Sequence, residues 1–375
     1  MIDNEKGINV LSLFDGISCG QLALHRAGIK INNYYASEID KHVIQITQKN
    51  FPDTIQLGDV TKWREWTIDW KSIDLIIGGS PCQSFSIAGN GKGFEGKSGL
   101  FYEYVDILNH IKQYNPNIKF LLENVVMKKE WEYEISKSLG ISPILIDSTL
   151  VSAQKRKRLY WTNIPNIQQP NDKRIYLKDI IEYGYYNNEE TNDGLVLIKI
   201  NEKVKVRKYP VDIIKLKELL IQSKIKAKLT IKEIANKLNK PITMVEHWFR
   251  NDKSFSIPSE DIWFELKGLL NITTNDFDNS ITEFEIKDGN FDMSKRVYKI
   301  NGKSPTLTTV SGGRQRQIMD NNYQIRELTP IECERLQTLP DNYTEGVSKV
   351  QRYKMIGNGW TVDIIAELLK KIKNI

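Results

Sequence analysis

Short apolar runs alternate with helix-length amphipathic segments over roughly the first 165 residues, and this alternation limits the possible folds more than any other feature. Such runs are typical of buried strands, and four are clear, at residues 9–14, 34–37, 73–79 and 119–123. Strands separated by helices predict an α/β fold with a doubly wound, mainly parallel sheet. Ligands bind at the carboxyl ends of the strands in such sheets, and the motifs described next lie there.

The character of the sequence changes after residue 165. A polar connection rich in Asn and Lys is followed, up to about residue 290, by helical periodicity without strands between, and α/β character returns from residue 328. We therefore predict a main α/β domain that starts at 1–165 and returns at 321–375. A smaller, mainly helical domain is predicted at 166–320, between these two parts.

Composition excludes several classes of protein. The chain has 375 residues, of which 40% are hydrophobic and 27% charged, as expected for a globular protein. Cys19, Cys82 and Cys333 are far apart and only four histidines are present, so we expect neither a disulfide framework nor a metal site. No signal peptide and no membrane-length apolar run is apparent, which predicts a cytoplasmic protein. A net charge of +6 is weak evidence for a polyanionic partner.

Three features predict a nucleoside-binding site. A glycine-bearing turn at residues 12–20 follows the first strand, where free N–H groups of a helix start can meet a ligand. Glu38 follows the second strand, at the distance where an acidic residue can bind ribose hydroxyls, and Asp59 comes after the strand-like residues 56–58. No GxGxxG motif is present, so an adenosine-containing cofactor is favoured over a dinucleotide.

Three further motifs carry chemistry. Pro81-Cys82-Gln83 presents a cysteine directly after the third strand, where a thiolate can act as a nucleophile. Glu123 leaves the end of an apolar strand, where a carboxyl group with one apolar wall can act as an acid. A solvated turn is the alternative interpretation. The segment 154–161 holds Arg156 and Arg158, which point the same way if it is extended and can then reach a phosphate or a base carbonyl. A solvated charge run is the alternative there.

In this order and spacing, the motifs resemble those of the cytosine-C5 DNA methyltransferase family, particularly the de novo-type animal enzymes and their phage and bacterial relatives. Two later segments, 326–337 and 357–362, resemble the late structural motif and the closing cofactor motif of the family. One departure is that Ser18-Cys19 intervene before Gly20, where many members have Phe-x-Gly-x-Gly. The resemblance covers residues 8–165 and 298–370 and implies a Rossmann-like domain that binds S-adenosylmethionine.

The resemblance also implies residue roles. Cys82 would attack C6 of a cytosine flipped out of double-stranded DNA. Glu123 would hydrogen-bond or protonate N3, and Arg158, helped by Arg156, would contact O2 and hold Glu123. Phe14 would stack near the adenine, Glu38 would bind the ribose and Asp59 the adenine amino group. The full set expected at the cofactor is Phe14, Asp15, Gly16, Glu38, Ile39, Asp59, Val60, Pro81, Leu100, Asn358 and Trp360.

The inserted segment would be the target recognition domain, and it contains a pattern of its own. Thr230 is placed to cap a helix with apolar positions at 231, 234, 235 and 238; residues 239–241 make a turn, and Thr243 would cap a second helix. This pattern predicts a helix-turn-helix in a bundle at about 205–280, although an ordinary helical hairpin is the alternative. The residues expected to contact DNA are Gln83, Ser84, Gln154, Thr243, His247, Arg250, Thr306 and Arg314.

Three functions compete. The favoured one is a sequence-specific DNA cytosine-C5 methyltransferase of a restriction-modification system or a phage, acting as a monomer, with a cognate restriction endonuclease as a further partner. The second is a DNA-binding regulator on an inactive methyltransferase scaffold, and a hybrid that also represses transcription remains open. The third is a transfer-RNA methylase, disfavoured because no cysteine lies between Cys82 and Cys333.

Overall fold

The structure is a computed structural model that describes residues 7–81, 99–182, 204–209, 213–252, 254–258, 260–277, 281–286, 296–309, 317–319 and 325–374. These residues form two compact units. The first lies within Met1–Glu182, Ser304–Gly313 and Thr329–Ile375, and the second within Tyr183–Lys303 and Arg314–Leu328. Cys82, Gln83, Ser84 and Arg314 lie outside the described residues. No described helix is long and apolar enough to cross a membrane.

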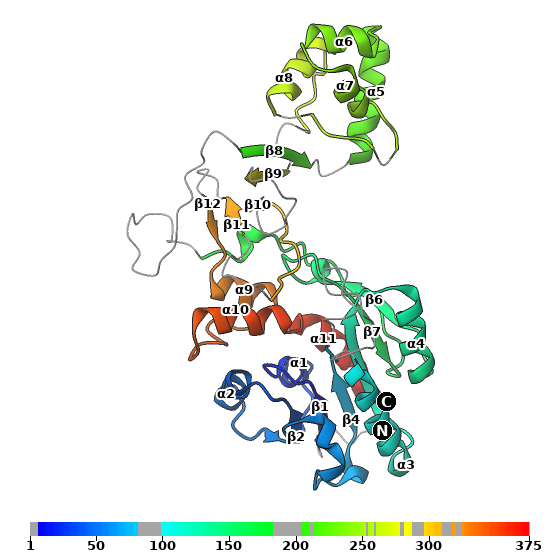
Figure 1. The fold of residues 1–375 in the computed structure, drawn as a ribbon, viewed down its shortest axis with the longest axis vertical. Coiled ribbons are helices and arrows are strands. Elements are labelled where there is room, and N and C mark those ends of the chain that lie inside the picture. The colour runs from blue at the N-terminus through cyan, green and yellow to red at the C-terminus, as the bar shows by residue number, and fades with distance from the viewer. Residues whose placement is uncertain are drawn as a thin grey trace. The chain divides into compact units, whose positions relative to one another are not determined.

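The first unit is built on a seven-stranded sheet with the order β3-β2-β1-β4-β5-β7-β6 (Figure 1). Its strands are β1 (Ile8–Leu13), β2 (Ile31–Ser37), β3 (Ile55–Gln56), β4 (Leu75–Gly78), β5 (Lys119–Val125), β6 (Ile144–Asp147) and β7 (Lys157–Thr162). All neighbours pair in parallel except β7, which runs antiparallel to both β5 and β6. The predicted α/β fold with a mainly parallel sheet is confirmed.

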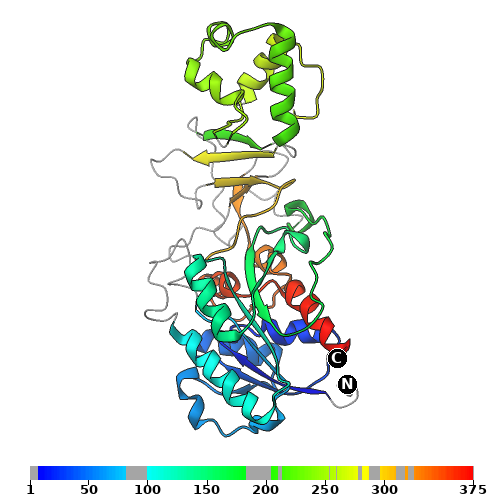
Figure 2. The same cartoon turned by 90° about the vertical axis from the view of Figure 1, so that its right-hand side faces the viewer.

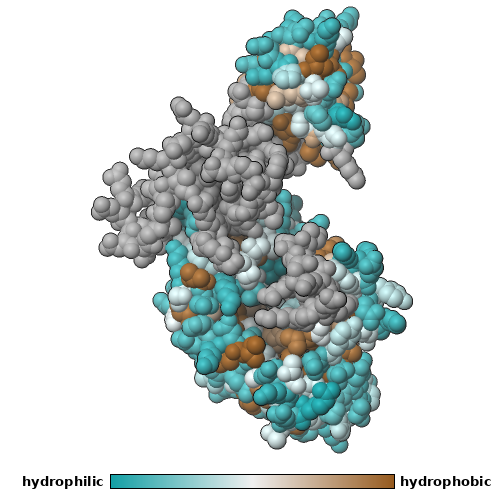
Figure 3. Space-filling view, viewed as in Figure 1, coloured by the Kyte–Doolittle hydropathy of each residue, from teal (hydrophilic) through white to brown (hydrophobic). Residues whose placement is uncertain are grey.

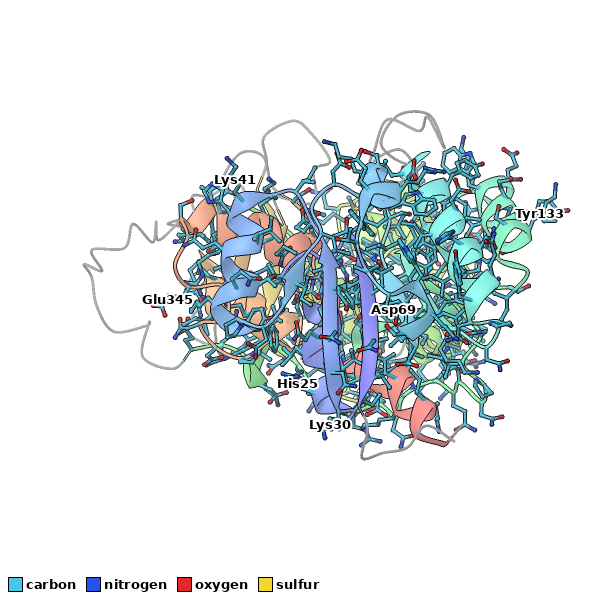
Figure 4. All side chains as sticks on the ribbon, turned by 90° about the horizontal axis from the view of Figure 1, so that it is seen from below. His25, Lys30, Lys41, Asp69, Tyr133 and Glu345 are labelled. Carbon is cyan, nitrogen blue, oxygen red and sulfur yellow. The ribbon has the colours of Figure 1, made fainter. Side chains whose placement is uncertain are left out.

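Helices cover both faces of this sheet and bury the apolar side chains of its strands on both sides. The helices are α1 (Cys19–Arg26), α2 (Lys41–Asn50), α3 (Phe101–Tyr114), α4 (Lys129–Leu139), α9 (Pro330–Leu336), α10 (Lys349–Asn358) and α11 (Val362–Leu369). One core joins the sheet to α1, α2 and α11, and the other joins it to α3 and α4. Figure 4 shows Lys41 of α2 and Tyr133 of α4 on opposite sides of the strands, and Figure 2 shows α11, in red, across the strands from α3. The C-terminal helices thus complete the domain that the N-terminal strands begin.

The second unit contains a helical bundle and a five-stranded sheet. Its elements are β8 (Val204–Tyr209), α5 (Ile213–Ala227), α6 (Ile231–Lys237), α7 (Ile242–Trp248), α8 (Glu260–Leu269), β9 (Ile281–Ile286), β10 (Arg296–Lys299), β11 (Gln317–Met319) and β12 (Ile325–Glu327). The strand order is β12-β11-β10-β9-β8. The prediction of helices without strands up to residue 290 was therefore wrong at β8 and β9. Both strands alternate apolar and polar residues with a period of two, as in Val204-Lys205-Val206-Arg207.

Candidate active site

The register of the sheet brings the sequence motifs to one edge. Leu13 pairs with Ser37 on one side and with Gly78 on the other, and Gly78 pairs with Leu122. Because these strands are parallel, the residues that follow them emerge side by side. The edge therefore carries Phe14, Glu38, Gly79 and Glu123 in neighbouring positions. Strand β7 runs the other way, so Arg158 near its start pairs with Val125 at the end of β5.

The turn after β1 has an unusual backbone. Phe14, Gly16 and Ser18 all have positive φ, of 57°, 60° and 55°, and for Phe14 and Ser18 this conformation is strained. Side chains hold the turn in place. The Gly16 amide donates to Glu38 Oε2 at 3.0 Å, and its carbonyl accepts from Thr47 at 3.2 Å. The turn is thus held in this conformation by the protein itself.

Two tyrosines complete the support of this turn, and no local sequence pattern predicts either of them. Tyr34 on β2 donates to Asp15 Oδ1 at 2.8 Å, and Tyr343 donates to the Ile17 carbonyl at 2.7 Å. Both phenol rings are buried. Tyr343 is 326 residues away from Ile17 in the chain, and only the fold places it there.

The predicted nucleoside-binding residues occupy the neighbouring strand ends. Glu38 accepts from Gly16 with one oxygen and from the Ile39 and Asp40 amides with the other, at 2.8 and 2.9 Å. Among the described residues, Oε2 accepts from Gly16 alone, so its second lone pair leaves capacity for a hydroxyl group. The Ile39 side chain is 71% exposed and offers an apolar surface beside this carboxylate. Asp59 caps a short helix through Thr61, whereas the Val60 side chain packs into the core.

Replacing Asp15 by asparagine is expected to change the pH dependence of stability. Burial raises the pKa of the Asp15 carboxyl from its ordinary 3.8 to about 6. Between about pH 4 and 6 the folded protein therefore keeps a proton on Asp15 that the unfolded chain has released, and the contribution of this group to the free energy of unfolding falls by about 3 kcal/mol as pH rises. Urea unfolding of the wild type and of Asp15→Asn across this range measures that contribution. The difference between the two free energies should shift in favour of the variant by about 3 kcal/mol as pH rises, and a difference that does not depend on pH would contradict the assignment.

An ion pair stands at the end of β5. Arg158 Nε lies 2.8 Å from Glu123 Oε1, and the two side chains are 12% and 10% exposed. The adjacent Asn124 donates to Ser80 Oγ at 3.1 Å, which ties this strand end to the segment just before Pro81. A carboxyl group with little solvent contact, held by one fixed cation, is well placed at a ring nitrogen. The ionised form can accept from an N–H there, and the protonated form can donate a proton.

Trp360 packs closely over two glycines of the site. A Cβ atom on Gly79 would lie 2.9 Å from Trp360 Nε1 and 3.3 Å from Glu123 Oε2, and one on Gly20 would lie 2.4 Å from Ile77 Cδ1. These positions therefore require glycine. The predicted cofactor residues Leu100 and Asn358 precede α3 and end α10, respectively, and Asn358 is exposed. The remaining thiols are unsuited to nucleophilic attack, since burial raises the pKa of Cys19 to about 12 and Cys333 is buried.

The structure corrects the expected roles of Arg156 and Gln154. Arg156 is only 3% exposed, and its NH1 and NH2 donate to the carbonyls of Leu307, Gly357 and Gly359 at 2.9–3.2 Å. Gln154 is fully buried and bonds to Leu336, Gln337 and Leu307. Both side chains therefore join chain segments instead of facing a base or DNA. The predicted DNA contact Thr306 donates to the Lys155 carbonyl at 2.7 Å.

Replacing Arg156 by lysine is expected to destabilise the protein by about 3 kcal/mol, because an ammonium group cannot reach three carbonyls and leaves buried acceptors without donors. Its exposed neighbour Lys157 supplies the matched control, since Lys157→Ala should change the free energy of unfolding by less than about 0.5 kcal/mol. Denaturant unfolding gives both values. A fully stable Arg156→Lys variant with lost activity would restore the catalytic role.

The DNA-reading residues predicted in the inserted segment have mixed positions. Thr230 caps α6 as predicted, in a capping box with Glu233, but α7 begins after Pro241 and Thr243 lies inside its first turn. His247 Nδ1 lies 2.6 Å from the Ser254 carbonyl. Arg250 is paired with Asp252 at 2.8 Å. Thr243 is exposed.

The chain is similar to known proteins over nearly its whole length. A family model described as C-5 cytosine-specific DNA methylase matches residues 8–374. The orphan methyltransferase M.Rho11sI of Bacillus phage rho11s is 25% identical, over 97% of this chain and 97% of its own. The type II methyltransferase M1.ScrFI of Lactococcus lactis subsp. cremoris is 28% identical, over 97% of this chain and 77% of its own. The Entamoeba histolytica methyltransferase EhMeth has the same fold, with a TM-score of 0.56 at 16% identity and 98% coverage of both chains.

Proposed function

The chain belongs to the C-5 cytosine-specific DNA methylase family, and from this premise we propose that it methylates C5 of a cytosine within a specific sequence of double-stranded DNA, using S-adenosylmethionine. The observation that carries the proposal is the Glu123–Arg158 pair at the end of β5. It stands beside the end of β4, where Pro81 leads directly into Cys82. Glu123 and Arg158 would then supply the acid and the orienting cation, and Cys82, which follows Pro81 in the sequence, would supply the nucleophile.

The residues at the β1, β2 and β3 ends fit S-adenosylmethionine. Glu38 retains acceptor capacity for ribose hydroxyls, exposed Ile39 offers a flat apolar contact for adenine, and the Asp59 carboxylate can accept from the adenine amino group. Phe14 and Asp15 lie in the supported turn beside them. When bound, the cofactor supplies an electrophilic methyl group.

The protein's own groups would prepare the cytosine for that methyl group. The Cys82 thiolate attacks C6 of the flipped-out base, and a sulfur–carbon bond forms while the ring electrons move toward N3 and C5. Glu123 holds or donates a proton at N3, and Arg158 fixes the carboxyl and binds O2. After C5 is methylated, loss of the C5 proton returns electrons to the ring and breaks the bond to Cys82, which restores the enzyme.

The second unit would recognise the target sequence. We propose 1–165 and 321–375 as the catalytic domain and 166–320 as the target recognition domain. Within these bounds, 166–182 and 304–313 lie in the first compact unit and 321–328 lie in the second. The similarity to phage and type II methyltransferases supports a cytoplasmic enzyme that modifies phage or bacterial DNA, as an orphan enzyme or beside a restriction endonuclease.

Transfer of labelled methyl groups to plasmid DNA tests the proposal. The expected result is label in DNA and, by conversion sequencing at single-base resolution, methylation at cytosines of one short sequence. Label in RNA alone would contradict the DNA substrate. A folded protein that binds DNA but transfers no label would favour the regulator function.

A further inference from the structure

We infer that α6, the following turn and α7 form a DNA-reading head that places the first half of α7 in the major groove, where it reads thymine methyl groups and a cytosine amino group instead of guanine. The inference rests on the proposed function only in taking DNA as the partner. It adds a base-reading surface with a stated chemistry to the second unit.

The two helices form a rigid corner with a core of their own. Ala235 on α6 is 1% exposed and is small enough for α7 to cross closely. The turn needs a left-handed residue, and Asn239 supplies it with a φ of 49°, while the Lys240 amide donates to the Ala235 carbonyl at 2.9 Å. The bundle core is completed by the buried residues Leu216, Leu220, Ile234, Val245, Trp248, Ile262, Trp263, Leu266, Leu270 and Ile272.

One side of α7 faces this core and the other is open. Val245 and Trp248 are 0% and 2% exposed. The period of 3.6 residues then directs Thr243 and Glu246 away from the core, and both are exposed. Ile242 and Met244, each 44% exposed, flank them. The bundle core does not include Ile242 or Met244, and their half-exposed apolar side chains suit contact with thymine methyl groups.

The last turn of α7 and the residues just after the helix make hydrogen bonds within the protein. Arg250 donates three hydrogen bonds to the Asp252 carboxylate, at 2.8–3.2 Å, and His247 is held at the Ser254 carbonyl. This exposed pair, with side chains 46% and 54% exposed, competes with guanine for the paired donors of the arginine. The groups that remain are the apolar side chains and the Thr243 methyl, which suit thymine C5-methyl groups, and the Glu246 carboxylate, which suits the cytosine N4 amino group.

The segment that precedes α7 is rich in lysine. Residues 224–240 contain six lysines and a single acidic residue, Glu233, and Glu233 is occupied as the capping partner of Thr230. Lys232 and Lys237 on α6 are exposed, on the helix that crosses the phosphate backbone in this geometry. Figure 3 shows hydrophilic and apolar residues side by side on the bundle surface, as expected for a base-reading surface bordered by charge.

Selection from random-sequence duplexes by the full-length protein, without cofactor and at one fixed salt concentration, tests the head. The double variant Thr243→Ala/Glu246→Ala is expected to bind the selected sequence at least about tenfold more weakly. The control Glu218→Ala/Gln222→Ala, at exposed positions of α5, should bind like the wild type. The variant Lys232→Ala/Lys237→Ala should weaken binding to all sequences alike. Unfolding midpoints verify that each variant is folded.

Uracil in place of thymine removes the methyl groups and nothing else. It should weaken wild-type binding about three- to tenfold and affect Ile242→Ala/Met244→Ala much less. Equal affinity and the same selected sequence for the wild type and the Thr243→Ala/Glu246→Ala variant, or indifference to uracil, would overturn the inference. Absence of methyl transfer with intact α7-dependent binding would instead refute the proposed function and leave the head standing.

Discussion

Cys82→Ala should lower the rate of methyl transfer at least about 10⁴-fold while the protein stays folded and binds DNA. In the proposed mechanism Cys82 forms the covalent bond to C6 that makes C5 reactive, and neither of the other two cysteines of the chain is suited to replace it. Among the remaining cysteines, burial raises the pKa of Cys19 to about 12, and Cys333 is 1% exposed in α9. Single-turnover transfer of labelled methyl groups measures the effect.

Cys333→Ala is the matched control for this prediction. It removes a buried thiol outside the site, and it should cost about 1 kcal/mol of stability without slowing transfer. If Cys82→Ala retained turnover within tenfold of the wild type, the nucleophile would have to be assigned elsewhere.

Glu123→Gln is expected to lower the rate of transfer by about 10²- to 10⁴-fold, because an amide cannot donate a full proton to N3. Arg158→Gln should lose activity as well, and it should in addition destabilise the protein. It leaves the Glu123 carboxylate, whose side chain is 10% exposed, without its cation at 2.8 Å, and that should also cost about 3 kcal/mol of stability.

The double variant Glu123→Gln/Arg158→Gln separates these two effects. Removing both charges should recover most of the lost stability and none of the activity. Chemical denaturation and single-turnover kinetics on the four proteins complete the cycle. A double variant as unstable as Arg158→Gln would show that the ion pair is not what holds this strand end.

The strand ends that form the site could be predicted from the sequence, because buried parallel strands are short apolar runs and the residues after them share one edge. That local pattern is enough to predict Glu38 and Glu123 at the same edge of the sheet. It could not place Tyr34 and Tyr343, whose hydroxyls hold the turn after β1. A hydroxyl that meets a carbonyl across 326 residues leaves no local pattern.

For Arg156 and Gln154, by contrast, the sequence predicted a role, but the predicted environment of the side chain was wrong. Their segment is basic and polar, which predicts a solvent- or DNA-facing surface, yet both side chains are buried. The cause is long-range: Leu307 and Gly357 present carbonyl groups that accept from Arg156, and the Leu307 amide donates to Gln154. A Cβ on Gly357 would lie 2.8 Å from the Thr308 carbonyl, which shows how closely these segments pack.

The inserted segment was predictable in its helices more than in its strands. Thr230 caps α6 and Ala235 lies in the bundle core, both as predicted from the helical period. Strands β8 and β9 are separated by the whole bundle, from residue 209 to 281, so their pairing could not be inferred from neighbouring sequence.

DNA that carries 5-fluorocytosine at the methylated position tests whether Cys82 forms a covalent bond to the cytosine ring. Fluorine at C5 cannot leave as the proton does, so the bond between the enzyme and C6 should persist after methylation. We predict a denaturation-resistant protein–DNA complex, formed only with S-adenosylmethionine, in which mass spectrometry locates the modified base on the peptide containing Cys82. A complex through another residue, or full methylation of ordinary DNA without any such complex, would contradict the account.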